Sequence, residues 1–206
     1  MKPKLKICGV TTLSDAQALI ELGVDAIGIN FWHKSKRYIS PEDAEPILEQ
    51  IKGKIERIGV FVNEDIKLLK KLISNDLIDA VQLHGNESDD YCQNLADNHI
   101  KYIRVIRIHP DDLTITIPKV IGESILLDTH VAGYGGAGKR FDWNLAERFI
   151  KECPQHKIII AGGITTDNIA QASLINPSMI DVASGAESAP GVKDKDKVAL
   201  MLAQLH

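Results

Sequence analysis

Short apolar runs alternate with amphipathic runs along the whole of this 206-residue sequence. The amphipathic runs have helical periodicity, whereas the apolar runs are of strand length. Strands that alternate with helices build α/β folds with a parallel sheet. Eight such units in so short a chain predict a single (β/α)8 TIM barrel over residues 1–206. An open doubly wound sheet shares the alternation, but no glycine-rich dinucleotide fingerprint follows the first strand. We expect the eight strands at residues 4–8, 25–30, 57–62, 80–85, 101–108, 124–128, 158–161 and 180–183.

The helical runs carry start signals at their N-terminal ends. Thr12 begins a capping box before the first helix, and Asn63 is expected to cap the third. After the seventh strand, Thr165 or Thr166 is expected to open a helix. Residues 111–122 are rich in Thr, Ile and Pro, which predicts that the helix expected there is short or irregular.

Composition excludes several classes of function. A formal net charge of -4 with lysines scattered singly argues against a nucleic-acid surface. No apolar run approaches the roughly 20 residues that span a bilayer, and the first strand begins too early to leave room for a signal peptide. The three cysteines, Cys8, Cys92 and Cys153, lie too far apart for a disulfide framework or a clustered metal site. We therefore expect a cytoplasmic protein without a metal or other cofactor.

The first strand ends on a thiol. Side chains alternate along a strand, so Lys6 and Cys8 share one face while Leu5 and Ile7 share the other. One interpretation makes Cys8 a small buried hydrophobe. The other makes it a thiolate that a nearby cation and a helix start stabilise. The position alone does not separate these two.

Two other reactive side chains stand at strand ends, where the active site of a TIM barrel lies. His84 lies at the end of the fourth strand and either caps or lines the barrel or takes part in chemistry. Asp128 ends the sixth strand and is either a cap, an ion-pair partner or an acid. The apolar residues 125–127 before it favour the neutral form of a carboxyl group, which suits a general acid.

Glycines follow the last two strands. Gly162 and Gly163 come after the seventh strand, and Ser184 and Gly185 come after the eighth. Each pair alone is explained by a tight turn. Together they occupy the two loops with which TIM barrels often bind phosphate, because glycine lets backbone N–H groups approach the oxygens.

Two further loops are expected at the barrel mouth. The loop after the sixth strand contains Gly133, Gly135, Gly136 and Gly138, and is either a surface connection or a lid over a substrate. Arg37 lies in the loop after the second strand and is either a solvated charge or a partner for a ligand carboxylate. From the residues alone, we expect an enzyme that moves protons on a phosphorylated metabolite with a thiol and a carboxylic acid.

At these residues the sequence resembles the phosphoribosylanthranilate isomerases of tryptophan biosynthesis. The matching motifs run from one end of the chain to the other, and their order and spacing are specific. They are KICGVT at 6–11, GINF at 28–31, SKR at 35–37, VQLHG at 81–85, LD at 127–128, GGAGKRFDW at 135–143, AGGI at 161–164, SGAE at 184–187 and PGVKD at 190–194.

The resemblance implies an Amadori rearrangement of N-(5-phosphoribosyl)anthranilate to 1-(2-carboxyphenylamino)-1-deoxyribulose 5-phosphate, with no cofactor. Cys8 would be the general base and Asp128 the general acid. The protein would be a monomer or a homodimer with this small molecule as its partner. Substrate-binding residues would be Arg37, Gln82, His84, Gly136 and Gly138, and phosphate-binding residues would be Gly162, Gly163, Ser184 and Gly185.

The sequence departs from the family pattern in three places. Lys36 stands where a proline often precedes the arginine, and Ala137 and Ala183 stand where hydroxyl residues are usual. These changes affect binding detail and leave the acid and base in place. Related ribose-phosphate barrels use two aspartates or a lysine instead of a thiol and a carboxyl group. A non-catalytic phosphosugar-binding barrel is the alternative from another functional class.

Overall fold

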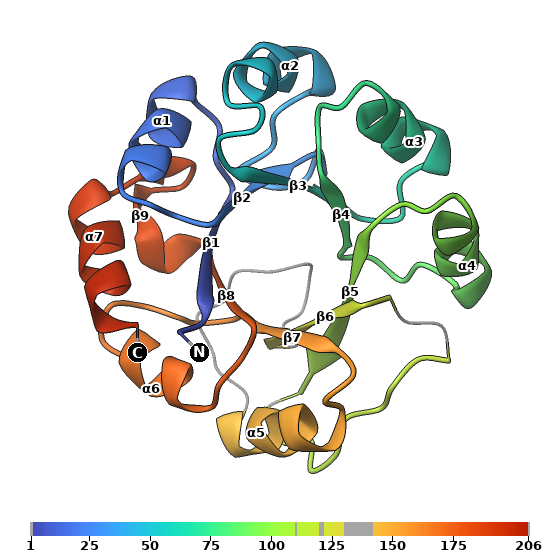
Figure 1. The fold of residues 1–206 in the computed structure, drawn as a ribbon, viewed down its shortest axis with the longest axis vertical. Coiled ribbons are helices and arrows are strands. Elements are labelled where there is room, and N and C mark those ends of the chain that lie inside the picture. Colours follow the sequence, from blue (N-terminus) through green and yellow to red (C-terminus); the bar gives the residue numbers. More distant parts are fainter. Residues whose placement is uncertain (1, 110, 120–121, 130–141, 206) are drawn as a thin grey trace.

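The computed structural model describes residues 2–109, 111–119, 122–129 and 142–205. Its eight parallel strands pair in sequence order, and the last pairs with the first, which closes the sheet. The helices form a ring outside these strands (Figure 1). The predicted TIM barrel is confirmed. The barrel strands are β1 Lys4–Cys8, β2 Ala26–Asn30, β3 Glu56–Phe61, β4 Ala80–Leu83, β5 Tyr102–Ile108, β6 Ser124–Thr129, β7 Lys157–Ile160 and β8 Met179–Val182.

Helices follow most of the strands. The described residues between β5 and β6 form no helix, although a short or irregular one was expected there. No described helix has the length and apolar character needed to cross a membrane. The helices are α1 Leu13–Glu21, α2 Pro41–Gln50, α3 Ile66–Ser74, α4 Asp89–Asp97, α5 Trp143–Glu152, α6 Ile169–Leu174 and α7 Lys195–Gln204; after β8 come the 3₁₀ helix η1 Ser184–Ala186 and the hairpin strands β9 Glu187–Ala189 and β10 Val192–Lys193.

Two of the predicted helix caps are wrong. Asp65, and not Asn63, caps α3 by accepting the N–H of Lys67. Asn63 has a left-handed φ of 51°, and its Oδ1 accepts the N–H of Asn86, so it joins the loops after β3 and β4. Likewise, the helix after β7 begins at Ile169 rather than at Thr165 or Thr166, because a turn occupies residues 166–168. By contrast, Thr12 caps α1 as predicted.

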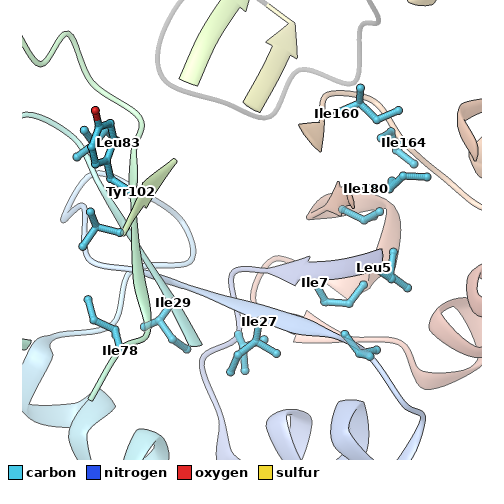
Figure 2. Close-up of a cluster of buried hydrophobic side chains, with 14 of the residues drawn as sticks. Leu5, Ile7, Ile27, Ile29, Ile78, Leu83, Tyr102, Ile160, Ile164 and Ile180 are labelled. Carbon is cyan, nitrogen blue, oxygen red and sulfur yellow. The ribbon is translucent and has the colours of Figure 1, made fainter. Parts of the chain in front are cut away.

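Apolar side chains fill two separate layers. The larger one lies between the strands and the helices and includes Leu5 and Ile7, which are fully buried (Figure 2). The smaller one has eight buried members from the strands and their ends. Burying each large aliphatic side chain stabilises the fold by roughly 1.5–3 kcal/mol. The smaller cluster consists of Ala26, Ile58, Ala80, Ile103, Leu126, Ile159, Ala161 and Met179.

Polar side chains from four strands are also buried. Lys6, Gln82, Asp128 and Asp181 are each less than 9% exposed. Lys6 of β1 stands in register with Asp181 of β8, so the two side chains start from neighbouring positions. Ions and amides removed from water require partners. Lys6 is bonded to Gln82 and Asp181. Asp128 is partnered by Thr129 and His84. The polar cluster is the core of the candidate site.

Candidate active site

A chain of polar contacts runs from β1 to β6. Lys6 Nζ donates to Gln82 Oε1 at 3.0 Å, and the Gln82 amide nitrogen lies 3.1 Å from His84 Nδ1. His84 Nε2 is 3.3 Å from Asp128 Oδ2. Because Lys6 only donates, Gln82 must turn its oxygen towards Lys6 and its NH₂ group towards His84. Nδ1 then accepts, so the proton of a neutral His84 ring sits on Nε2, facing Asp128.

Asp128 is held in place from several sides. The Thr129 amide donates to its Oδ1 at 2.8 Å, while His84 faces its Oδ2. Gly162 leaves space for this carboxyl group, since a Cβ there would lie 2.7 Å from Oδ1. Gly162 therefore packs directly against the predicted acid, in addition to turning the chain after β7 with a φ of +85°.

Cys8 lies at the opposite end of this chain of contacts and is partly exposed. Burial raises the pKa of its thiol, and the charge of Lys6 opposes that effect. The nearby Asp181 carboxylate adds to the rise, while Lys193 lowers the pKa. Because the net shift is upwards, the thiol is the resting form at neutral pH. The cation next to Cys8 is Lys6, which the alternation of side chains along the strand predicted to lie on the same face.

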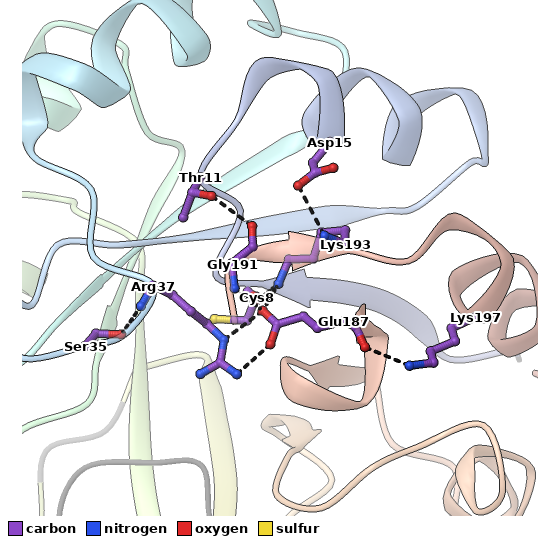
Figure 3. Close-up of polar contacts among 9 residues, drawn as sticks. All are labelled: Cys8, Thr11, Asp15, Ser35, Arg37, Glu187, Gly191, Lys193 and Lys197. Atoms are coloured by element: carbon purple, nitrogen blue, oxygen red, sulfur yellow. Dashed lines mark hydrogen bonds and ion pairs between the residues drawn. The ribbon is translucent and has the colours of Figure 1, made fainter. Parts of the chain in front are cut away.

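Arg37 is part of a buried ionic cluster (Figure 3). Its Nε and Nη2 donate to the two carboxylate oxygens of Glu187 at 2.8 and 2.6 Å. Lys193 Nζ donates to Glu187 Oε1 and to the Cys8 carbonyl oxygen, both at 2.6 Å. Burial disfavours the charged form of Glu187, but hydrogen bonds from Arg37 and Lys193 outweigh it and lower its pKa. The cluster ties the hairpin after β8 to the end of β1.

We expect Glu187→Ala to destabilise the protein by roughly 3–5 kcal/mol, since it leaves Lys193 buried without its counter-ion. The two side chains are 4% and 1% exposed. Glu147→Ala is the matched control, because Glu147 and Lys151 form an equally short pair, 2.7 Å, with side chains 40% and 70% exposed. Urea unfolding of both variants measures the difference. Equal losses of about 1 kcal/mol or less would show that the buried pair contributes no more than a surface pair.

The same comparison predicts a pH dependence. A carboxyl group with a lowered pKa in the folded state contributes stability above its unfolded pKa, and this contribution disappears as the pH falls through the folded pKa. The Glu187 pKa is lowered. The stability difference between wild type and Glu187→Ala should therefore be full at neutral pH and shrink as the pH falls below about 4.3, the ordinary value for glutamate.

The glycines after β7 and β8 bring two loops together. A Cβ on Gly185 would lie 2.0 Å from the carbonyl oxygen of Ile164, so only glycine permits this approach. Gly163 has a left-handed φ of +65°, and Ser184 and Gly185 form η1 beside it. The predicted phosphate-binding loops are thus neighbours. Gly136 and Gly138 lie outside the described residues.

The sequence did not reveal the importance of several groups in this site. No function was predicted for Asp181, Glu187 or Lys193. Glu187 and Lys193 nevertheless lie in two of the family-like motifs, at 184–187 and 190–194. The clue that the sequence did offer was their place in or after the eighth strand, because that strand pairs with the first and so brings this part of the chain to Cys8. Within the described ranges, no group of three or more His, Cys, Asp or Glu side chains is arranged to hold a metal ion.

Comparisons with known proteins show the family of this chain. The family model for N-(5'phosphoribosyl)anthranilate (PRA) isomerase matches residues 5–204. The chain belongs to this isomerase family. A relative with that name from Trichlorobacter lovleyi is 39% identical over 197 residues, which cover 95% of this chain and 94% of the relative.

Solved structures of the PRA isomerase family share the fold. The crystal structure of phosphoribosyl anthranilate isomerase from Thermotoga maritima is 34% identical, with a TM-score of 0.83 and 98% of both chains covered. A PRA isomerase in complex with reduced 1-(o-carboxyphenylamino)-1-deoxyribulose 5-phosphate is 31% identical, with a TM-score of 0.78, and covers 98% of this chain and 97% of that one.

Proposed function

We propose that this chain catalyses the Amadori rearrangement of N-(5'-phosphoribosyl)anthranilate in tryptophan biosynthesis, with Asp128 as acid and Cys8 as base. The observation that carries the proposal is the pair of unlike proton-transfer groups at one barrel mouth, joined by the Lys6–Gln82–His84 contacts. An acid and a base that act in one turnover need different surroundings at the same pH. The family relationship supplies the substrate.

The first step is ring opening. Asp128 gives a proton to the furanose ring oxygen, the C1′–O bond breaks, and the anthranilate nitrogen lone pair forms the C1′=N bond of a Schiff base. Thr129 N donates to Oδ1 and His84 Nε2 lies 3.3 Å from Oδ2, so both carboxyl oxygens have a neighbour that favours one orientation of the acid. A proton positioned in this way typically accelerates a reaction 10²- to 10⁴-fold, as an order of magnitude.

The second step removes a proton from carbon. The Cys8 thiol first loses its proton to water, and the resulting thiolate takes the C2′ proton. The electron pair of the broken C–H bond forms a C1′=C2′ bond, and the C=N electrons return to nitrogen. The resulting enolamine becomes the ketone when its hydroxyl loses a proton and C1′ gains one. Lys6 and Lys193 are the cations that favour the thiolate in this step.

Ligand binding uses the remaining charged and glycine-rich groups. Glu187 occupies the Nε–Nη2 edge of Arg37, which leaves Nη1 and the second Nη2 hydrogen for another carboxylate. This free edge suits the carboxylate of anthranilate, because guanidinium binds planar carboxylates through two parallel bonds. The adjoining loops with Gly163 and Gly185 suit the phosphate.

The test is an isomerase assay with freshly generated phosphoribosylanthranilate. We expect the anthranilate-type fluorescence to decay faster than in an enzyme-free control, where only spontaneous hydrolysis occurs. The protein concentration should set the rate of this decay. If the protein bound the reduced product analogue of the solved complex but gave no decay above the control, the non-catalytic binding barrel would replace the isomerase.

A further inference from the structure

Lys6 and Asp181 form an ion pair inside the barrel that the two proposed proton transfers do not use directly. Lys6 Nζ is 2.8 Å from Asp181 Oδ2, and the lysine side chain is fully buried. An ammonium group in such a place costs free energy unless its partners repay the lost hydration. Burial disfavours the charged form of Lys6, but Asp181 and Cys8 outweigh it and raise the lysine pKa. The group therefore stays charged at neutral pH.

The pair lies next to the thiol. The position that a Cβ on Gly28 would occupy is 2.7 Å from Cys8 Sγ and 3.1 Å from Lys6 Nζ. The sulfur and the nitrogen are therefore within about 6 Å of each other, a distance at which opposite charges shift ionisation. Gly28 stands in register with Cys8 on the adjacent strand, so a larger residue would push the two groups apart.

Lys6 has a donor to spare. An ammonium group has three N–H donors, and Gln82 and Asp181 take one each. Among the described residues the third donor remains for the charge of the nearby Cys8 sulfur. The other cations that face the thiol, Lys193 and Arg37, are both bonded to Glu187. Lys6 is thus a fully buried cation on the same strand face as the thiol, with a donor left for the charge that develops on Cys8.

Asp181 acts in the opposite direction. Its Oδ2 accepts from Lys6, but its buried Oδ1 has no hydrogen-bond partner among the described residues. Part of its negative charge is therefore uncompensated, and that charge disfavours a second anion on Cys8. The lysine and the aspartate have effects of opposite sign on the same thiol.

We propose that Lys6 is a positioning residue that stabilises the thiolate of Cys8, and that Asp181 limits this stabilisation. The inference rests on the proposed function only in giving that thiolate a catalytic use. It explains why a lysine is kept inside a barrel, where an apolar side chain would pack at lower cost. It also adds Lys6 and Asp181 to the groups that set the pH dependence of the reaction.

The test measures the rate at which iodoacetamide alkylates Cys8 between about pH 6 and pH 10, where thiols titrate. Cys92 and Cys153 are buried, and Cys8→Ser provides the blank for any reaction at them. Lys6→Met should move the midpoint of the alkylation profile up by about one pH unit and slow alkylation at neutral pH roughly tenfold. Asp181→Asn should move the midpoint down. Lys6→Arg keeps the positive charge, so its midpoint should stay near that of wild type.

Shifts of opposite sign would support the inference, because a loss of packing has no reason to reverse sign between the two variants. Shifts in the same direction, or no shift in either, would overturn it. If Lys6→Met does not fold, the downward shift in Asp181→Asn decides the matter by itself. Alkylation needs no substrate, so opposite shifts in a protein without turnover would contradict the proposed function and leave this inference standing.

Discussion

Asp128→Asn is expected to lower kcat roughly a thousandfold while KM stays within about threefold of the wild-type value. Asparagine has the same shape and can still accept the Thr129 N–H bond that holds Asp128 Oδ1. It has no acidic proton to give to the ring oxygen. The interaction that is lost is therefore made only in the transition state, which lowers kcat and kcat/KM alike.

Steady-state kinetics and the affinity for the reduced product analogue together measure this effect. Asp97→Asn is the control, since Asp97 is an exposed aspartate at the end of α4, on the outside of the barrel. The control should retain wild-type kinetics. A variant of Asp128 that lost analogue binding together with turnover would show that this carboxylate has a structural role and is not the acid.

Cys8→Ser is expected to reduce kcat at least about a hundredfold at neutral pH. A serine hydroxyl is a much weaker acid than a thiol, so it supplies almost no oxyanion to take the C2′ proton. The change replaces sulfur with a smaller oxygen at the partly exposed end of β1, where little packing is lost. Stability in urea should therefore remain near that of wild type.

Cys153→Ser is the matched thiol replacement away from the site, at the C-terminal end of α5. Its turnover per folded molecule should equal that of wild type. If Cys8→Ser kept its turnover, the reaction would stand and the base would lie elsewhere. His84 would then be tested next, because its ring lies beside Asp128 in the same site.

The barrel was predictable because its signal is repeated and local. Side chains alternate between the two faces of each strand. In β1, Leu5 and Ile7 lie on one face, and Lys6 and Cys8 lie on the other. Caps were less predictable when a polar side chain had two possible uses. Asn63 illustrates this, since it bonds the loop after β4 instead of the first turn of α3.

The candidate site was predictable where one residue type implies a chemistry. Cys8 and Asp128 stood out as a thiol and a carboxyl group at strand ends. The bonding of Arg37 was not predictable, because its partner Glu187 lies 150 residues further along the chain. Long-range ion pairs leave no periodic pattern, and one charged side chain in a sequence does not identify its counter-ion.

The joining of β1 to β8 gives the protein an order of assembly during synthesis. Cys8 emerges from the ribosome well before its ionic neighbours Asp181 and Lys193, which follow 173 and 185 positions later. Contacts between such distant segments form late, because the intervening chain must first be brought together. A nascent chain that ends before β8 has its thiol but neither of these charges, nor the strand that closes the barrel. The thiol therefore acquires its reactive surroundings only after β8 and the hairpin that follows it have been synthesised.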